Sequence, residues 1–532
     1  MTSYSSKRYA QCFLLFLVFV FHVTANLWVL QKSRVARTYD EGGRIYYGIT
    51  YFQKLFLDPQ PDIPAAFSDI LTLALNQLHP HSFDFFEALS FKALDLFHAV
   101  SIERMIVVVN AIFLAVLLVS VYNLGSIIYG RDAGLLAAFL VSFFPIVFGQ
   151  SRAAMLDYPT MCFVSLSMWM LYKTQSFSSA YFSAITGIAF GMAQLMKSSA
   201  MLFLSAPAVY FFCRSYYSGQ KKKVFFNGVL FVFFFILVAG LVYLRKENLN
   251  ALSVYHSKIL YCDTHNNYLF YVANFWKLTG PFLFCLSLLP LAGYIWSIKK
   301  RDKLLLLWLF VPLILFSLSA NKSYRFILPL LPAFALIVAG EIKTGKFLSL
   351  FRSGYGVSIV LAAAMQYMFL HCGFVSLGKY PQSSVEGGVM SVRTDAYAST
   401  ADSLSVLFEK EAGRKGGEKK SIVYLMRIGA IHWPVHLYLL LHQLPYVGYC
   451  YTELDEADLK NYNYADVDWG AKIVSADYIV DKSGEKCIPG FVSFVEDLQR
   501  KKFEEIKDQF DLITQMHVFD GSSLFVYRKK TL

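Results

Sequence analysis

Residues 105–124 read MIVVVNAIFLAVLLVSVYNL, a stretch without a single Lys, Arg, Asp or Glu. As an α-helix it is about 30 Å long, which matches the hydrocarbon layer of a bilayer. Ten other tracts are apolar along most of their length, and the tracts at 181–196 and 199–217 fit either two helices or one broken helix. Eleven transmembrane helices are therefore predicted, at 10–30, 105–124, 133–149, 157–173, 181–196, 199–217, 224–244, 278–297, 303–320, 326–341 and 353–372.

The composition of the 532-residue chain agrees with a membrane protein. It is 56% hydrophobic and 17% aromatic but only 16% charged, against about 25% charged residues in soluble domains. This excludes a disordered chain, a collagen-like chain and an ordinary soluble enzyme. The net charge of +12 does not predict a nucleic-acid partner, because much of it lies beside the apolar tracts.

The distribution of Lys and Arg predicts the orientation. Basic runs such as Lys221–Lys223 and Lys299–Arg301 lie in loops that are cytoplasmic if the N-terminus is cytoplasmic. Eleven crossings then place residues 31–104, 245–277 and 373–532 outside. An alternative for the first tract, which follows Lys7 and Arg8, is a signal peptide.

The last 160 residues differ in composition from the rest. Beyond about Gly373 the apolar tracts end, and charged and turn residues return. We therefore predict a transmembrane domain at 1–372 and a small extracytoplasmic α/β domain at 373–532. A disulfide between Cys450 and Cys487 is an open alternative. The predicted strands are Ser421–Met426, Tyr478–Val480 and Ser523–Tyr527, and the predicted helices are Ala401–Glu411 and Phe491–Lys507.

Polar residues gather at the predicted outer ends of the helices. Asp40 and Glu41 follow the first tract, within the first outer loop at 31–104, and Arg152 and Asp157 join the third and fourth tracts. Taken singly, each fits an interfacial or helix-capping residue equally well. A carboxylate in a partly desolvated mouth also suits general-base chemistry, because burial raises its pKa. The other outer candidates are His79, Arg104, Lys197, Tyr324 and Arg325.

In this order and on one side, the clusters resemble the polytopic glycosyltransferases of the GT-C class. The nearest resemblance is to the dolichyl-phosphate-mannose protein mannosyltransferases and the lipid A aminoarabinose transferase. It covers roughly residues 10–345, while the C-terminal domain is similar by position alone. The motifs that carry it are Asp40-Glu41, Arg104, Arg152 to Pro159, Lys197 at the end of a Gly-rich helix, and Arg325 to Pro332. One departure is Pro80-His81, where the family has Pro-Pro after a His or Lys, so His79 takes the basic position.

The resemblance implies a sugar donor on a polyprenyl phosphate and transfer with inversion to an acceptor hydroxyl on the outer face. It implies that Asp40 deprotonates the acceptor, with Glu41 supporting the loop and Asp157 orienting a basic residue or the acceptor. Cations placed where charge grows on the leaving phosphate lower the barrier, and Arg forks suit phosphate oxygens. The implied donor-binding residues are His79, Arg104, Arg152, Lys197, Tyr324 and Arg325.

The same resemblance implies the partners and the cellular setting. The expected partners are the lipid-linked donor, a glycan, lipid or protein acceptor and the bilayer, without nucleic acid. No cofactor is expected to be obligatory, although a divalent metal near Asp40 or Asp157 is an alternative. The C-terminal domain tilts the expectation towards undecaprenyl phosphate and a bacterial inner membrane.

Two function classes compete with the enzyme. One is a transporter or flippase, which acids midway along the helices would favour, yet the predicted helix interiors carry almost none. The other is a non-catalytic binder of prenyl phosphate, which would keep its function without Asp40. An oligosaccharyltransferase of the same class would carry a Trp-Trp-Asp type motif, which this sequence lacks.

Overall fold

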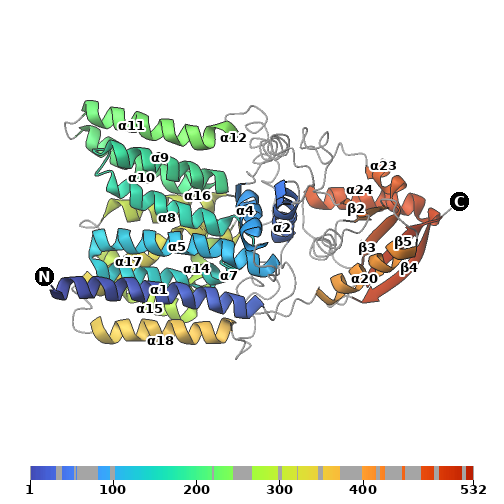
Figure 1. Cartoon of the computed structure of the whole chain (residues 1–532), viewed down its shortest axis with the longest axis horizontal. Coiled ribbons are helices and arrows are strands. Elements are labelled where there is room, and N and C mark those ends of the chain that lie inside the picture. The colour runs from blue at the N-terminus through green and yellow to red at the C-terminus, as the bar shows by residue number, and fades with distance from the viewer. Residues whose placement is uncertain are drawn as a thin grey trace.

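The computed structural model describes most of the chain and divides into a helical bundle and a small sheet domain. Figure 1 shows the long helices lying side by side, with the C-terminal sheet beyond one end of the bundle. Helices α2 and α4 lie between the two parts. The described residues are 2–30, 39–52, 55–56, 82–95, 102–217, 221–243, 267–296, 302–319, 322–344, 352–371, 398–414, 420–425, 446–449, 469–483, 491–517 and 523–530.

The bundle is built from the predicted apolar tracts, each of which overlaps helical structure. The stretch 181–217 forms two helices, which answers the question left open by the sequence. The elements before the sheet domain are α1 (Thr2–Leu30), α2 (Tyr39–Phe52), α4 (Ser82–Asp95), α5 (Ile102–Tyr129), α6 (Arg131–Phe143), α7 (Pro145–Gln150), α8 (Asp157–Lys173), α9 (Ala180–Met196), α10 (Ala200–Tyr217), α11 (Lys221–Phe235), the π-helix η2 (Ile236–Gly240), α12 (Leu241–Tyr243), α14 (Phe270–Thr279), α15 (Pro281–Trp296), α16 (Lys303–Leu318), the 3-10 helix η5 (Tyr324–Leu330), α17 (Leu331–Thr344) and α18 (Arg352–His371).

Length and apolarity identify fewer clear spans than eleven. Within the described residues, 4 helical stretches are long and apolar enough to cross a membrane, or up to 5 if a bent pair forms one span. Several of the other predicted tracts form helices that are individually short, such as Ala180–Met196 and Lys303–Leu318. The chain is therefore an integral membrane protein with several apolar helices, and the count of eleven spans stays a prediction.

Two breaks shape the bundle, and proline follows each of them. Phe144 is extended (φ −65°, ψ 130°) between α6 and α7, and Pro145 begins α7, as expected for the residue before a proline. Helices α14 and α15 meet at an angle of 114°. Gly280 takes a positive φ of 79° there, which a glycine adopts at little cost. Gln366 of α18 donates to Thr279 O at 3.0 Å and satisfies this carbonyl at the break.

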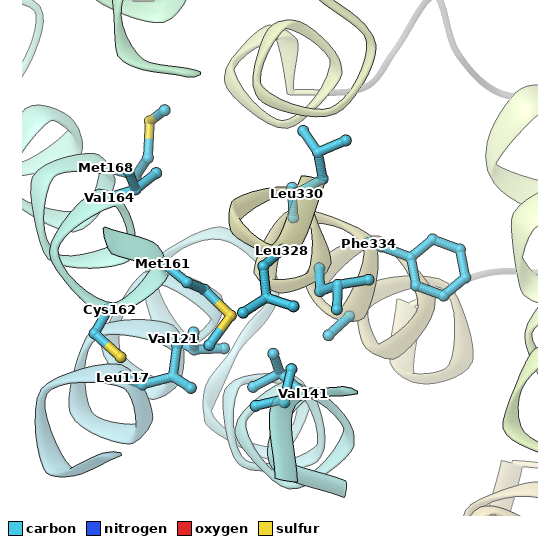
Figure 2. Packing of buried hydrophobic residues seen from close by; sticks show 14 of the residues in the cluster. Leu117, Val121, Val141, Met161, Cys162, Val164, Met168, Leu328, Leu330 and Phe334 are labelled. Carbon is cyan, nitrogen blue, oxygen red and sulfur yellow. The ribbon is translucent and has the colours of Figure 1, made fainter. Parts of the chain in front are cut away.

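The core of the bundle joins α5, α6, α8 and the η5–α17 segment. Figure 2 shows Leu117, Val141, Met161 and Leu328 converging from these elements, and all four are at most 1% exposed. Lipid surrounds the bundle, so close packing rather than a hydrophobic drive from water holds the helices together. The core therefore fixes which helix ends meet at each surface.

Glycines in α9 permit a close contact with α11 and with η2, which follows it. A Cβ atom on Gly187 would come within 2.3 Å of Phe231 O, and one on Gly191 within 2.6 Å of Val238 Cβ. Small residues spaced four apart let two membrane helices approach closely. The Gly-rich character of the helix before Lys197 thus has a packing role.

The C-terminal part contains a five-stranded mixed sheet with the order β2-β1-β3-β5-β4. Strands β1, β2 and β3 are parallel, whereas β5 pairs antiparallel with β3 and β4. Leu404, Phe408, Val480 and Val526 belong to its core. The elements are α20 (Ala398–Arg414), β1 (Lys420–Tyr424), β2 (Tyr446–Tyr449), α23 (Trp469–Ser475), β3 (Tyr478–Lys482), α24 (Phe491–Ile506), the 3-10 helix η7 (Lys507–Gln509), β4 (Phe510–His517) and β5 (Ser523–Lys529).

The α/β character predicted for this region is confirmed, including the strands near 421, 478 and 523 and both helices. Strands β2 and β4 were not predicted. Cys450 and Cys487 lie outside the described residues, so their disulfide stays a prediction.

Candidate active site

A buried carboxylate with two cations forms the centre of the site. Asp157, in the first turn of α8, is 4% exposed. Its Oδ1 lies 2.6 Å from Lys197 Nζ, and its Oδ2 lies 3.8 Å from Arg325 Nε. Within the described residues, these two contacts set one carboxylate against two cations. The structure thus brings together three residues that the sequence singled out separately.

The helix connections explain why these residues meet. Helices α8 and α9 form an antiparallel hairpin, so Asp157 at the start of the first and Lys197 just after the second share one end of the bundle. Arg325 comes from η5, which packs against α8. Phe326 adds an aromatic contact, because Lys197 Nζ lies 4.6 Å from its ring centroid. A desolvated ammonium gains from such a ring face.

The segment before α8 is irregular and buried, and asparagines in neighbouring helices hold it. Asn26 of α1 donates to Ser151 Oγ at 2.8 Å, and Asn110 of α5 donates to Ala153 O at 2.9 Å. Buried backbone groups outside regular structure need such partners. These two polar residues within apolar tracts therefore fix the loop that leads to Asp157, and the hydrogen bond of Asn26 also ties α1 into the bundle.

Arg152 lies in this buried loop and is 4% exposed. Its Cζ lies 5.3 Å from the ring centroid of Phe148 on α7. The loop also contacts the Asp157 centre directly, because Arg325 Nη1 donates to Met155 Sδ at 3.8 Å. Arg152 is therefore a buried cation in the loop that contacts the Asp157 centre, which makes it a candidate for binding an anionic group.

Tyr324 connects the centre to a lysine that the sequence did not single out. Lys277 Nζ of α14 donates to Tyr324 OH at 3.4 Å, and the Tyr324 ring stacks on Phe270 with centroids 5.1 Å apart. Lys277 lies two residues before the end of α14 at Thr279, where the sharp bend to α15 follows. A lysine just before a Gly-Pro break in an apolar stretch was the signal that could have found it.

Lys322, two residues before Tyr324 in the chain, is a further cation near the site. It is 9% exposed, and burial lowers the pKa of its ammonium. Its Nζ donates to the backbone oxygen of Ser319, the residue that caps the end of α16. Lys322 thus lies just before η5, the segment that carries Tyr324 and Arg325.

Asp40 and Glu41 lie in the first turn of α2, and their side chains are outside the described part of the chain. The helix that carries them is anchored by an ion pair that the sequence did not predict. Arg44 Nη1 of α2 lies 3.0 Å from Oδ2 of Asp84 on α4, and Asp84 is fully buried. The acids are therefore part of an ordered helix rather than of a plain loop.

The remaining donor-binding candidates are Arg104 and His79. Arg104 is exposed at the start of the α5 span and forms no ion pair with any described residue. His79 lies outside the described residues. The assignment of both to donor binding stays a prediction.

The residues that the structure describes do not support a metal site. Within the described ranges, no group of three or more His, Cys, Asp or Glu residues could hold a metal ion. Asp157 already faces two cations, which makes it a poor ligand for a third. The side chains of Asp40 and Glu41 lie outside the described part of the chain.

Similar proteins were found by sequence and by structure. Residues 79–243 match the sequence model of the family described as dolichyl-phosphate-mannose-protein mannosyltransferase. An uncharacterized protein of Aquifex aeolicus (strain VF5) is 27% identical over 219 residues, or 39% of this chain. The match spans 42% of the length of that curated relative.

Two solved structures share the fold over most of the chain. ArnT from Cupriavidus metallidurans bound to undecaprenyl phosphate aligns with a TM-score of 0.58 and 10% identity, covering 96% of this chain and 97% of that one. The apo oligosaccharyltransferase of Archaeoglobus fulgidus aligns with a TM-score of 0.51 and 12% identity, covering 88% and 69%. The resemblance to the GT-C class predicted from the sequence is thereby confirmed for the fold.

Proposed function

We propose that the protein is a glycosyltransferase that moves a sugar from a polyprenyl-phosphate donor to an acceptor hydroxyl. The observation that carries the proposal is the Asp157–Lys197–Arg325 centre. It holds two cations at one end of a membrane bundle, on the side of α2 and the C-terminal sheet. A lipid phosphate at the membrane boundary is the anion that such a centre suits. ArnT, whose fold the chain shares, was solved with undecaprenyl phosphate, which supports this class of donor.

The centre suits the leaving group of the reaction. When the bond between the anomeric carbon and the phosphate oxygen breaks, negative charge grows on the prenyl phosphate. Lys197 and Arg325 are held on Asp157 before substrate arrives, so they need little reorganisation to stabilise this charge. Arg152 and Lys277 are further cations for the phosphate oxygens. Tyr324 positions Lys277 through its hydroxyl.

The acceptor side of the reaction is assigned to α2. Asp40 takes the proton of the acceptor hydroxyl, the oxygen attacks the anomeric carbon from the face opposite the phosphate, and prenyl phosphate departs. One displacement of this kind inverts the anomeric centre. Glu41 supports the first turn of the helix, and the Arg44–Asp84 ion pair holds α2 against α4. Asp157 serves as a positioning residue rather than as the base, because its oxygens already face two cations.

We further propose the setting of the reaction. Residues 1–372 form the catalytic membrane domain and 373–532 an extracytoplasmic domain that selects the acceptor. The N-terminus is cytoplasmic, and the membrane is a bacterial inner membrane with undecaprenyl phosphate as carrier. No metal takes part in the displacement.

The test uses the full chain in lipid nanodiscs with a panel of prenyl-phospho-sugars and lysate as the source of acceptor. Release of prenyl phosphate is compared for the wild type, Asp40→Asn and the control Asp132→Asn, an exposed acid near the start of α6. We expect release by the wild type and the control and its loss in Asp40→Asn. If all three proteins bind the lipids and none releases prenyl phosphate, the proposed enzymatic activity is refuted. A lipid binder or a flippase would then be favoured.

A further inference from the structure

An apolar pocket of about 510 Å³ lies between α10 and α11. Every residue that lines it is apolar or glycine. Phe177, from the turn that joins α8 to α9, closes one side, so the pocket lies toward the end of the bundle away from Asp157. The lining includes Phe177, Ala208, Phe212, Gly228, Val229 and Val232.

The pocket opens to the lipid-facing surface of the bundle. Val209, Phe225 and Phe233 line it and are 60%, 59% and 57% exposed. A space without polar groups offers water no hydrogen bonds, so hydrocarbon is the occupant that fits it. Gly228 allows Phe212 of α10 to lie close to α11, because a Cβ atom there would come within 2.6 Å of Phe212 Cε2.

A basic cluster lies on the same two helices as the pocket. Lys221, Lys222 and Lys223 begin α11 and are exposed, as is Arg214 in the last turn of α10. None of the three lysines forms an ion pair with a carboxylate in the described ranges. Juxtamembrane lysines each contribute about 1 kcal/mol to the attraction of an anionic lipid surface. The cluster and the pocket are adjacent because both belong to α10 and α11.

The length of α11 from the lysines to Phe233, which lines the pocket, matches the thickness of one leaflet. The ten steps of helical rise from Lys223 to Phe233 span about 15 Å, which is half of a hydrocarbon layer of about 30 Å. A headgroup at the lysines therefore places an acyl chain alongside the pocket. The donor phosphate belongs elsewhere, because Asp157 and Lys173 at the two ends of α8 are about 24 Å apart by the same rise.

We propose that this pocket binds one acyl chain of an anionic phospholipid, with its phosphate on Lys221–Lys223. The lipid comes from the leaflet opposite the Asp157 centre, which the proposed orientation makes the cytoplasmic leaflet. The lipid site is separate from the donor site, and binding of the phospholipid does not depend on catalytic turnover.

The proposal is tested by native mass spectrometry of the purified full chain in detergent. An equimolar mixture of dioleoyl phosphatidylglycerol and dioleoyl phosphatidylcholine is added, and the retained lipid is identified. We expect one phosphatidylglycerol to be retained in preference to phosphatidylcholine. The triple variant Lys221→Gln/Lys222→Gln/Lys223→Gln should lower its retention about tenfold or more, and Lys303→Gln at the start of α16 should leave it unchanged.

A second pair of variants tests the pocket itself. Val229→Phe fills the pocket from a half-exposed position, whereas Val360→Phe adds the same bulk on the lipid-facing side of α18, where Val360 is 48% exposed. We expect only Val229→Phe to lower phosphatidylglycerol retention at an unchanged melting temperature. Equal retention of both lipids, or equal behaviour of the two variants, would overturn the proposal. So would weaker binding of prenyl phosphate by Val229→Phe with phosphatidylglycerol unaffected, which would assign the pocket to the donor tail.

Discussion

The substitution Asp157→Asn tests how the two cations are held. With an effective dielectric constant of about 20, Coulomb's law gives about 6 kcal/mol of attraction for the 2.6 Å contact with Lys197 and about 4 kcal/mol for the 3.8 Å contact with Arg325. Desolvation offsets much of this, and loss of one partner of a buried pair costs about 3–5 kcal/mol. Asn still accepts a hydrogen bond from Lys197. We therefore expect the substitution to weaken the interactions that hold Lys197 and Arg325 in place by about 2–3 kcal/mol.

The expected effect on turnover follows from that loss. A misplaced pair of cations stabilises the leaving phosphate less, and 2–3 kcal/mol corresponds to a fall in the rate of about 30- to 150-fold. The assay is single-turnover release of prenyl phosphate in nanodiscs, with the melting temperature as a check of folding.

A double-mutant cycle with Lys197→Met separates positioning from an independent role. If Asp157 acts through Lys197, the double variant should be about as slow as the slower single variant, with a coupling energy of about 0.5–3 kcal/mol. Wild-type turnover by Asp157→Asn would refute the reasoning. Effects of the two substitutions that simply multiply would show that Asp157 does not act through Lys197.

Three further predictions concern the framework of the site. Asn110→Leu removes the hydrogen bond that holds the buried loop before α8, and we expect turnover to fall about tenfold with a lower melting temperature; unchanged values in both would exclude this support. Gly187→Leu should prevent folding or lower the melting temperature strongly, whereas Gly354→Ala, where a Cβ atom meets nothing within 4 Å, should be neutral in the same thermal assay. Arg44→Met takes the cation from the buried carboxylate of Asp84, and protease cleavage in the α2–α4 region should become at least several-fold faster; equal cleavage would show that the pair does not anchor α2.

Much of the fold was predictable because apolar length and composition decide it locally. The tract 105–124 lies within the continuous helix α5, and the strands near 421, 478 and 523 were found from short apolar runs between turns. Strand β4 was missed because its residues Phe510–His517 alternate weakly, and burial along it is slight after Phe510. An exposed edge strand of this kind has no clear alternation of apolar and polar residues by which a sequence could predict it.

The candidate site was predictable as a set of residues but not as a geometry. Asp157 and Lys197 are 40 positions apart, and their contact depends on how α8 and α9 pack as an antiparallel hairpin. Arg325 joins them only through the packing of η5 on α8. Lys277 depends on the 114° bend at Gly280, which no local pattern of apolar residues fixes. The contacts within the site therefore depend on long-range packing and on helix breaks, which the sequence motifs do not specify.

The most direct test of the proposed activity uses a donor with one label on the sugar and another on the prenyl chain. The wild-type protein in nanodiscs is incubated with this donor and an acceptor source, and both labels are followed over time. The account predicts that free prenyl phosphate and acceptor-linked sugar appear in equal amounts. Recovery of the intact donor, whether bound to the protein or moved across the bilayer, would contradict it.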